Sequence, residues 1–272
     1  SRLHLDAEAL MKLDPFRIVA GVILTLTLGA AQAAVQSKAV TYDDHGTKLT
    51  GHLYWDDAKT GKRPGIVVYH EWWGLNDYAK KRARMLAELG YVAFAADMYG
   101  DGKVTETPDQ ARQWMQQVTT DVDLWRERAN LGLAQLAASD LVDTKKLAAI
   151  GYCFGGGTVL QMAYGGADLK GVVSFHGSLP AAPDEAKGKI KPKILALHGQ
   201  ADAMIPPEIV QNFEAKATAA EANWELVSYG GVRHGFTNPD AGKAGIANLK
   251  YDAQADARSW ARMKDFFGEI LE

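Results

Sequence analysis

The only cysteine of the chain lies between two glycines, directly after a short apolar run. Residues 147–150 predict a buried strand, Gly151 and Gly155 flank Cys153, and a helical pattern follows. Glycine at these two positions lets a strand and a helix meet at a sharp turn that holds the residue between them in a strained conformation. The start of the helix then favours a thiolate or an oxyanion. The pattern favours a nucleophile, although a small buried core cysteine is the alternative.

An acidic residue and a histidine follow Cys153, each after a later predicted strand. Asp202 comes after the apolar run that ends at Leu197, and His234 after the run that ends at Tyr229. In this order the aspartate can orient the imidazole, which takes the thiol proton and later passes it to a leaving group. Taken singly, Asp202 could be interpreted as a helix cap and His234 as a solvated loop residue, but their joint placement favours catalysis.

A third loop of interest begins with His70-Glu71, directly after another apolar run. A nucleophile on such a turn needs two backbone N–H donors for an oxyanion, one from Phe154 and one from this loop. The pair is not a zinc-binding helix motif, because Gly74 stands where a second histidine is required. Another histidine at a strand end, His198, precedes the acid, and we interpret it as a structural neighbour.

Strand and helix patterns alternate around these loops. Residues 38–42 and 48–55 indicate an opening hairpin, and the later continuous apolar runs are typical of strands buried on both faces. We therefore predict a single α/β domain over residues 34–272, with a mainly parallel central sheet and helices on both faces. Ligands of such folds bind beyond the carboxyl ends of the strands. The later strands are predicted at 65–69, 91–95, 147–151, 171–175, 193–197 and 224–229, and helices at 76–89, before 139, and at 155–164, 206–220 and from 252.

Composition limits the kind of protein that this is. Of the 272 residues, 47% are hydrophobic and 23% are charged, which excludes a disordered or fibrous chain. The net charge of −3 gives no support to nucleic-acid binding. One cysteine cannot form an internal disulfide, a zinc ribbon or an iron–sulfur site. We expect neither a metal nor an organic cofactor.

Residues 1–33 are predicted to be a leader that contains a signal peptide. Lys12 and Arg17 precede an apolar run at 18–29, and small residues follow up to Ala33. This run is shorter than the ~20 residues of a membrane span. We therefore expect Sec-type export with cleavage near Ala33/Ala34, and a periplasmic or secreted protein without a membrane anchor. Residues 1–10 are interpreted as extra sequence ahead of a natural start at Met11.

Several short motifs make the chain similar to the dienelactone hydrolase (carboxymethylenebutenolidase) family of α/β-hydrolases. The similarity runs from about Val40 to the terminal helix. Most α/β-hydrolases carry a serine nucleophile and lack the glutamate of the first loop, so this combination is specific. The motifs are His70-Glu71-Trp-Trp-Gly-Leu-Asn76, Ala96-Asp-Met-Tyr99, Gly151-Tyr-Cys-Phe-Gly-Gly156, Gln200-x-Asp202 with Ile205-Pro206, and His234-Gly-Phe236.

The resemblance implies a catalytic triad and an oxyanion hole, formed by Cys153, His234 and Asp202 and by the N–H groups of Trp72 and Phe154. It also implies a role for Glu71, which in the family contacts the resting thiol and takes part in its activation. A nearby carboxylate disfavours the thiolate and so protects the sulfur of an exported enzyme from oxidants. We expect substrate to displace Glu71 and release the nucleophile.

The chain departs from the family where substrate is recognised. Pathway enzymes of the family hold a substrate carboxylate with two arginines, and Asn238 stands at one of these positions. The other position aligns loosely near Pro108. Losing a bidentate arginine is not a conservative change. We expect an aromatic, mostly apolar substrate pocket that is lined by Trp72, Trp73, Phe154, His176 and Phe236. Arg112 and Arg233 are further candidates for this pocket.

Together these observations predict a hydrolase that cleaves a lactone or carboxylic ester, with a dienelactone-type enol lactone favoured, through a thioester on Cys153. A broad-specificity carboxylesterase is the nearest alternative. A non-catalytic binding protein that kept the fold is another. We expect a small-molecule substrate and a monomer, with no nucleic-acid partner.

Overall fold

An antiparallel hairpin begins the part of the chain that the computed structural model describes, residues 34–272. β1 (Val35–Asp44) pairs with β2 (Thr47–Asp56) along its whole length. Between them, His45 and Gly46 have φ values of 49° and 85°, the positive angles of a tight two-residue turn. The predicted hairpin is confirmed, whereas the predicted leader at residues 1–33 lies outside the described residues.

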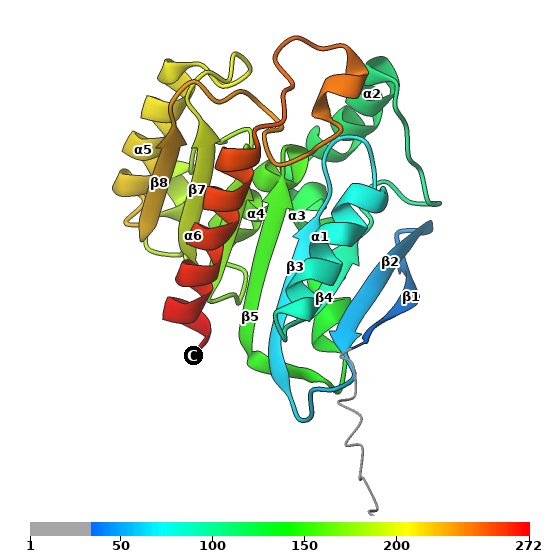
Figure 1. Ribbon diagram of the computed structural model, residues 1–272. Helices are drawn as coiled ribbons and strands as arrows, with labels where there is room; N and C mark the ends of the chain where they lie inside the picture. The colour runs from blue at the N-terminus through cyan, green and yellow to red at the C-terminus, as the bar shows by residue number, and fades with distance from the viewer. Residues whose placement is uncertain (1–33) are drawn as a thin grey trace, which may run out of the picture. The chain divides into compact units, whose positions relative to one another are not determined.

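The hairpin joins six further strands in an eight-stranded sheet with the order β1-β2-β4-β3-β5-β6-β7-β8. β2 pairs antiparallel with β4, and the neighbours from β4 to β8 are parallel (Figure 1). The continuous apolar runs become buried central strands because helices cover both faces, whereas β8 at the edge of the sheet is only partly buried. The six strands are β3 (Arg63–Tyr69), β4 (Val92–Ala96), β5 (Val142–Tyr152), β6 (Gly171–Phe175), β7 (Lys193–Gly199) and β8 (Trp224–Tyr229).

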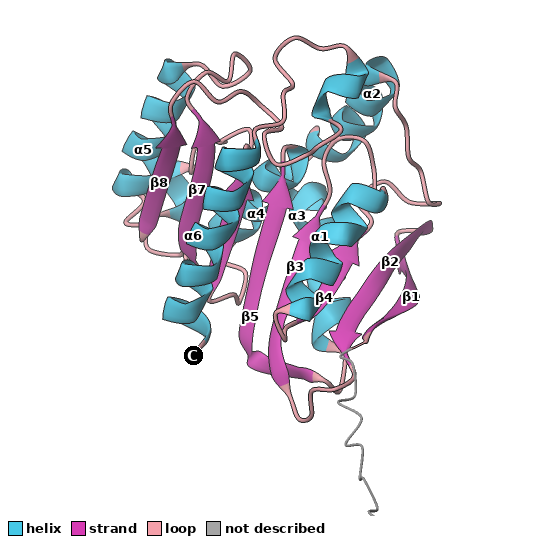
Figure 2. Ribbon diagram, in the orientation of Figure 1, coloured by secondary structure: helices cyan, strands magenta, loops and turns pink. Residues whose placement is uncertain are grey.

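Helices pack on the two sides of the sheet (Figure 2). Side chains of α1 and α6 form one apolar core with the sheet, and side chains of α3, α4 and α5 form the other. This arrangement is that of an α/β-hydrolase, as predicted. The helices are α1 (Asp77–Glu88), α2 (Pro108–Thr119), α3 (Val122–Ala137), α4 (Phe154–Tyr164), α5 (Pro207–Ala219) and α6 (Ala253–Leu271).

Most boundaries lie within three residues of the sequence prediction, and two differences are larger. The helical stretch before residue 139 is two helices, because Asp121 caps a new start by accepting the N–H groups of Asp123 and Leu124. β5 begins at Val142 rather than 147, since its first polar residues pair with the start of β3 despite a register shift there. Among the described residues, no helix combines the length and apolar character of a membrane span.

Candidate active site

Cys153 lies on the sharp turn between β5 and α4, as the N-cap residue of α4. Its φ of 54° and ψ of −113° are rare outside glycine, and its N–H donates to the Phe175 carbonyl oxygen at 3.0 Å. A Cβ at Gly151 would lie 1.9 Å from the carbonyl oxygen of Gly155, and a Cβ at Gly155 would lie 2.3 Å from that of Tyr69. Both glycines are therefore needed for the strand and helix to meet.

His234 and Asp202 are joined by a 2.6 Å hydrogen bond between Nδ1 and Oδ2. The other oxygen of Asp202 accepts bonds from Asn248 Nδ2 at 3.0 Å and from the Met204 N–H at 2.9 Å. Although burial opposes ionisation, these donors lower the pKa of Asp202 to about 2. Burial also lowers the pKa of His234, but Cys153 and Asp202 raise it well above its ordinary value. Nε2 of His234 bonds to no other described residue, so it is available to the sulfur.

The loop between β3 and α1 is held by two side chains whose role the sequence did not reveal. His70 is fully buried, and its Nε2 accepts the Met98 N–H at 3.1 Å. Its proton is therefore on Nδ1, which donates to the Glu71 carbonyl oxygen at 2.5 Å. Tyr99 donates its hydroxyl to the Trp72 carbonyl oxygen at 2.9 Å. Met98 and Tyr99, which follow β4, thus fix the shape of the loop between β3 and α1.

Two backbone N–H groups beside Cys153 are without an acceptor. Within the described part of the chain, neither Trp72 nor Phe154 donates its N–H to another group. Both residues line the same cavity as the cysteine. Backbone donors left free in this way can bind a ligand oxygen. The two N–H groups that we predicted as the oxyanion hole are therefore free of other acceptors within the described residues.

Glu71 is buried near this centre but bonds to Asn238 rather than to the thiol. Asn238 Nδ2 donates to Glu71 Oε2 at 2.6 Å, while its Oδ1 accepts the Asp240 N–H at 2.9 Å, which fixes the orientation of the amide. The expected contact with Cys153 is not among the hydrogen bonds of the described residues, because the amide holds the carboxylate instead. Burial raises the pKa of Glu71 to about 7, against the lowering effect of this bond.

A cavity of about 380 Å³ opens over Cys153 beyond the carboxyl ends of the strands. None of its described lining residues is an arginine, a lysine or an acid. A larger hollow of about 780 Å³ lies at the amino ends of β5 to β7, but it holds no cysteine or histidine. We therefore place the site in the smaller cavity, which is lined by Trp72, Met115, Thr119, Trp125, Cys153, Phe154, Ser178, Pro180, Met204, Ile205, His234 and Leu249.

Several predicted substrate-binding residues lie outside this lining. His176 and Phe236 are fully buried and pack together at a centroid distance of 5.2 Å. Arg112 pairs with Asp109 on the surface, and Arg233 donates to the backbone of a neighbouring loop. Trp73 contacts the ring of Trp72 but does not reach the cavity lining. Instead α2 and α3 supply Met115, Thr119 and Trp125, whose part in the pocket the sequence pattern did not reveal.

One group of possible metal ligands occurs among the described residues. Oxygen and nitrogen atoms of Asp44, His45 and Glu127 lie within 4.8 Å of one another. Asp44 is already paired with Arg128, whose positive charge disfavours a cation beside it. The group therefore does not indicate a metal site.

The sequence profile of the dienelactone hydrolase family matches residues 49–271, most of the chain. The chain belongs to the dienelactone hydrolase family. This dienelactone hydrolase family member is accordingly a hydrolase of ester bonds that acts on a small molecule.

Relatives agree with this assignment. A candidate carboxymethylenebutenolidase of Yersinia pestis is 29% identical and the alignment covers 84% of this chain and 86% of that protein. A dienelactone hydrolase-like promiscuous phosphotriesterase from metagenomic libraries is 40% identical, with a TM-score of 0.85 over 88% of this chain and 100% of that one. The structure of a candidate dienelactone hydrolase from Klebsiella pneumoniae, 23% identical, shares the fold with a TM-score of 0.68 over 86% of this chain and 99% of that one.

Proposed function

We propose that the protein hydrolyses uncharged lactones or carboxylic esters through a thioester on Cys153. The observation that carries this proposal is the placement of a strained cysteine next to a paired histidine in a cavity whose described lining holds no arginine, lysine or acid. The free N–H groups of Trp72 and Phe154 support it, because they can hold the oxygen that becomes negative during attack.

Acylation begins with the transfer of the thiol proton to Nε2 of His234 and attack of the sulfur on the carbonyl carbon. Asp202 keeps the ring in the tautomer that can accept this proton and stabilises the imidazolium. When the carbon–oxygen bond breaks, the imidazolium protonates the leaving oxygen. A water molecule, deprotonated by the same imidazole, then cleaves the thioester and restores the thiol.

The substrate class follows from the absence of arginine and lysine side chains in the described lining. A carboxylate bound here would lose its hydration without gaining a guanidinium or ammonium partner, which is costly. Asn238, at the position of a family arginine, is bonded to Glu71 and does not line the cavity. We therefore expect neutral enol lactones and aryl esters to be better substrates than a dienelactone that carries a carboxylate.

Intact-mass spectrometry of the quenched enzyme tests this proposal. Neutral enol lactones and p-nitrophenyl acetate are expected to add an acyl group to Cys153, and Cys153→Ala to lose both the adduct and turnover. The ratio of the two rates separates a lactonase from a broad carboxylesterase. Undiminished turnover by Cys153→Ala would support a different mechanism or a contaminating activity, and preference for the anionic dienelactone would contradict the substrate class.

A second candidate activity is the hydrolysis of neutral phosphotriesters. The 40% identical relative is a dienelactone hydrolase-like promiscuous phosphotriesterase, and a neutral triester suits a cavity whose described lining holds no arginine, lysine or acid. The thiol proton would pass to His234 as the sulfur attacks phosphorus and the aryl oxide leaves, and water would then cleave the S–P bond and restore the thiol. A dialkyl aryl phosphate assayed with wild type and Cys153→Ala tests this, and equal release of the phenol by both proteins would contradict it.

We also propose export to the periplasm or exterior, on the strength of the basic, apolar and small-residue segments within residues 1–33. Fractionation of cells that express the full chain is expected to place the protein outside the cytoplasm. N-terminal sequencing of that fraction is expected to begin near Ala34. Intact protein retained in the cytoplasm would contradict the proposal.

A further inference from the structure

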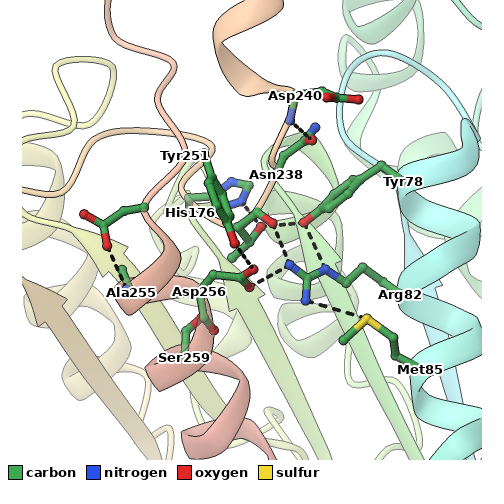
Figure 3. A network of polar contacts seen from close by, with 12 residues as sticks. Tyr78, Arg82, Met85, His176, Asn238, Asp240, Tyr251, Ala255, Asp256 and Ser259 are labelled. Atoms are coloured by element: carbon green, nitrogen blue, oxygen red, sulfur yellow. Dashed lines mark hydrogen bonds and ion pairs between the residues drawn. The ribbon is translucent and has the colours of Figure 1, made fainter.

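A chain of buried polar groups outside the cavity lining runs from Arg82 through Tyr78 to His176 (Figure 3). Arg82 of α1 donates from Nη2 to Asp256 of α6 at 2.6 Å and to the Thr237 carbonyl oxygen at 2.6 Å, and from Nε to the Tyr78 hydroxyl at 3.3 Å. The Thr237 hydroxyl lies 2.5 Å from the Tyr78 hydroxyl and 2.7 Å from Nε2 of His176. We call Arg82, Tyr78 and Thr237 the Arg82 relay.

The direction of the hydrogen bonds in this relay is set by its first member. A guanidinium only donates, so the Tyr78 oxygen is an acceptor and its proton points to the Thr237 hydroxyl. The hydroxyl then donates its own proton to Nε2 of His176. This arrangement leaves one buried group unpaired, the Nδ1 of His176. If Thr237 instead donated to Tyr78 and His176 to Thr237, the Tyr78 hydroxyl proton would also lack an acceptor, which is costly in a buried site.

His176 packs its ring against that of His234, with centroids 5.2 Å apart and an interplanar angle of 63°. The charged groups that act on His176 are His234, Asp202 and Arg82, and the ring of Tyr152 packs at 6.0 Å. Burial lowers the pKa of His176 well below its ordinary value, and the positive charges of His234 and Arg82 act in the same direction. A proton on His176 would repel the imidazolium that catalysis requires of its neighbour.

We propose that the Arg82 relay keeps His176 neutral and thereby makes it a positioning residue for His234. The proposal rests on the proposed function, in which His234 carries the positive charge during acylation. A neutral ring in van der Waals contact fixes the orientation of the catalytic imidazole without competing for its proton. The relay also ties this position to α1 and α6 through the Arg82–Asp256 ion pair, which has little exposure.

The wild-type protein itself gives the first test. In ¹⁵N-histidine-labelled protein, NMR of the ring nitrogens is expected to show His176 protonated on Nδ1, unprotonated on Nε2 and unchanged through the neutral range. A His176→Asn sample assigns the signal. Protonation of Nε2, or titration of His176 near neutral pH, would overturn the proposal. This measurement needs no substrate, so it stands apart from the acyl-adduct experiment on Cys153, whose failure would instead overturn the proposed function.

Variants of Thr237 give the second test. Thr237→Val keeps the shape and the backbone carbonyl but removes the hydroxyl, so we expect the acid limb of kcat to move up by about one pH unit. Thr237→Ser is expected to restore the wild-type profile. Arg262→Met, which breaks a surface ion pair with Glu225, is the control and should keep that profile. An unmoved acid limb in a folded Thr237→Val protein would overturn the proposal.

Discussion

Replacing Asp202 by asparagine should block His234 by changing its tautomer rather than by removing its neighbour. The Oδ1 atom of Asp202 already accepts two donors, from Asn248 and from the Met204 backbone. The oxygen of an asparagine must occupy that position, so its NH₂ group faces Nδ1 of His234. The ring then accepts at Nδ1 and carries its proton on Nε2. A protonated Nε2 cannot take the thiol proton of Cys153.

The size of the effect follows from the alternative arrangement. Turning the amide would restore the tautomer but would leave two buried donors unpaired, at about 2 kcal/mol each. A penalty of about 4 kcal/mol corresponds to a loss of roughly 10³-fold in kcat, and comparable changes in serine-based triads reach about 10⁴-fold. We therefore expect kcat to fall between these limits with little change in KM.

The assay is steady-state hydrolysis of p-nitrophenyl acetate, with the rate of thiol alkylation by iodoacetamide as a substrate-free readout. Asp252→Asn is the matched control, because Asp252 caps α6 through the Ala255 N–H and asparagine caps equally well. Circular dichroism melts establish that both variants fold. A folded Asp202→Asn protein with kcat within tenfold of wild type would refute the tautomer argument.

Four further results are expected. The folded state holds the Glu71 proton up to about pH 7, whereas the unfolded chain releases it near pH 4.5, so the free energy of unfolding falls as the pH rises across this window. Glu71→Gln should therefore raise Tm by several degrees at pH 8 but not at pH 4. An equal shift in Tm at both pH values would contradict this. Although Glu71 is bonded to Asn238 rather than to the thiol, removing its charge should speed the alkylation of Cys153, and unchanged rates would count against an electrostatic restraint by this carboxylate. Gly155→Ala should abolish folding or activity in expression and turnover assays, since its Cβ would overlap the Tyr69 carbonyl oxygen; a normal enzyme would disprove the tight approach. Arg233→Ala, at an exposed side chain bonded to a backbone carbonyl, should leave KM unchanged, and a large rise in KM would place it in the substrate site.

Much of the framework could be predicted because local patterns and global fold agree here. Short continuous apolar runs are typical of strands covered on both faces, and Gly151 and Gly155 around Cys153 specify one kind of turn. Parallel strands then bring the residues after each run to one edge of the sheet. That is why the joint placement of Asp202 and His234 could be inferred although they are distant in sequence.

The lining of the cavity and the partners of Glu71 were decided only by the tertiary structure. Which side of α2 faces the sulfur, whether His176 points into the cavity or packs behind it, and which donor holds a buried carboxylate all depend on contacts between segments far apart in the chain. The sequence by itself determined the kind of chemistry, because a strained nucleophile needs particular neighbours along the backbone. The structure determined what surrounds that chemistry, because burial and the choice of hydrogen-bond partners are properties of packing and have no local signature.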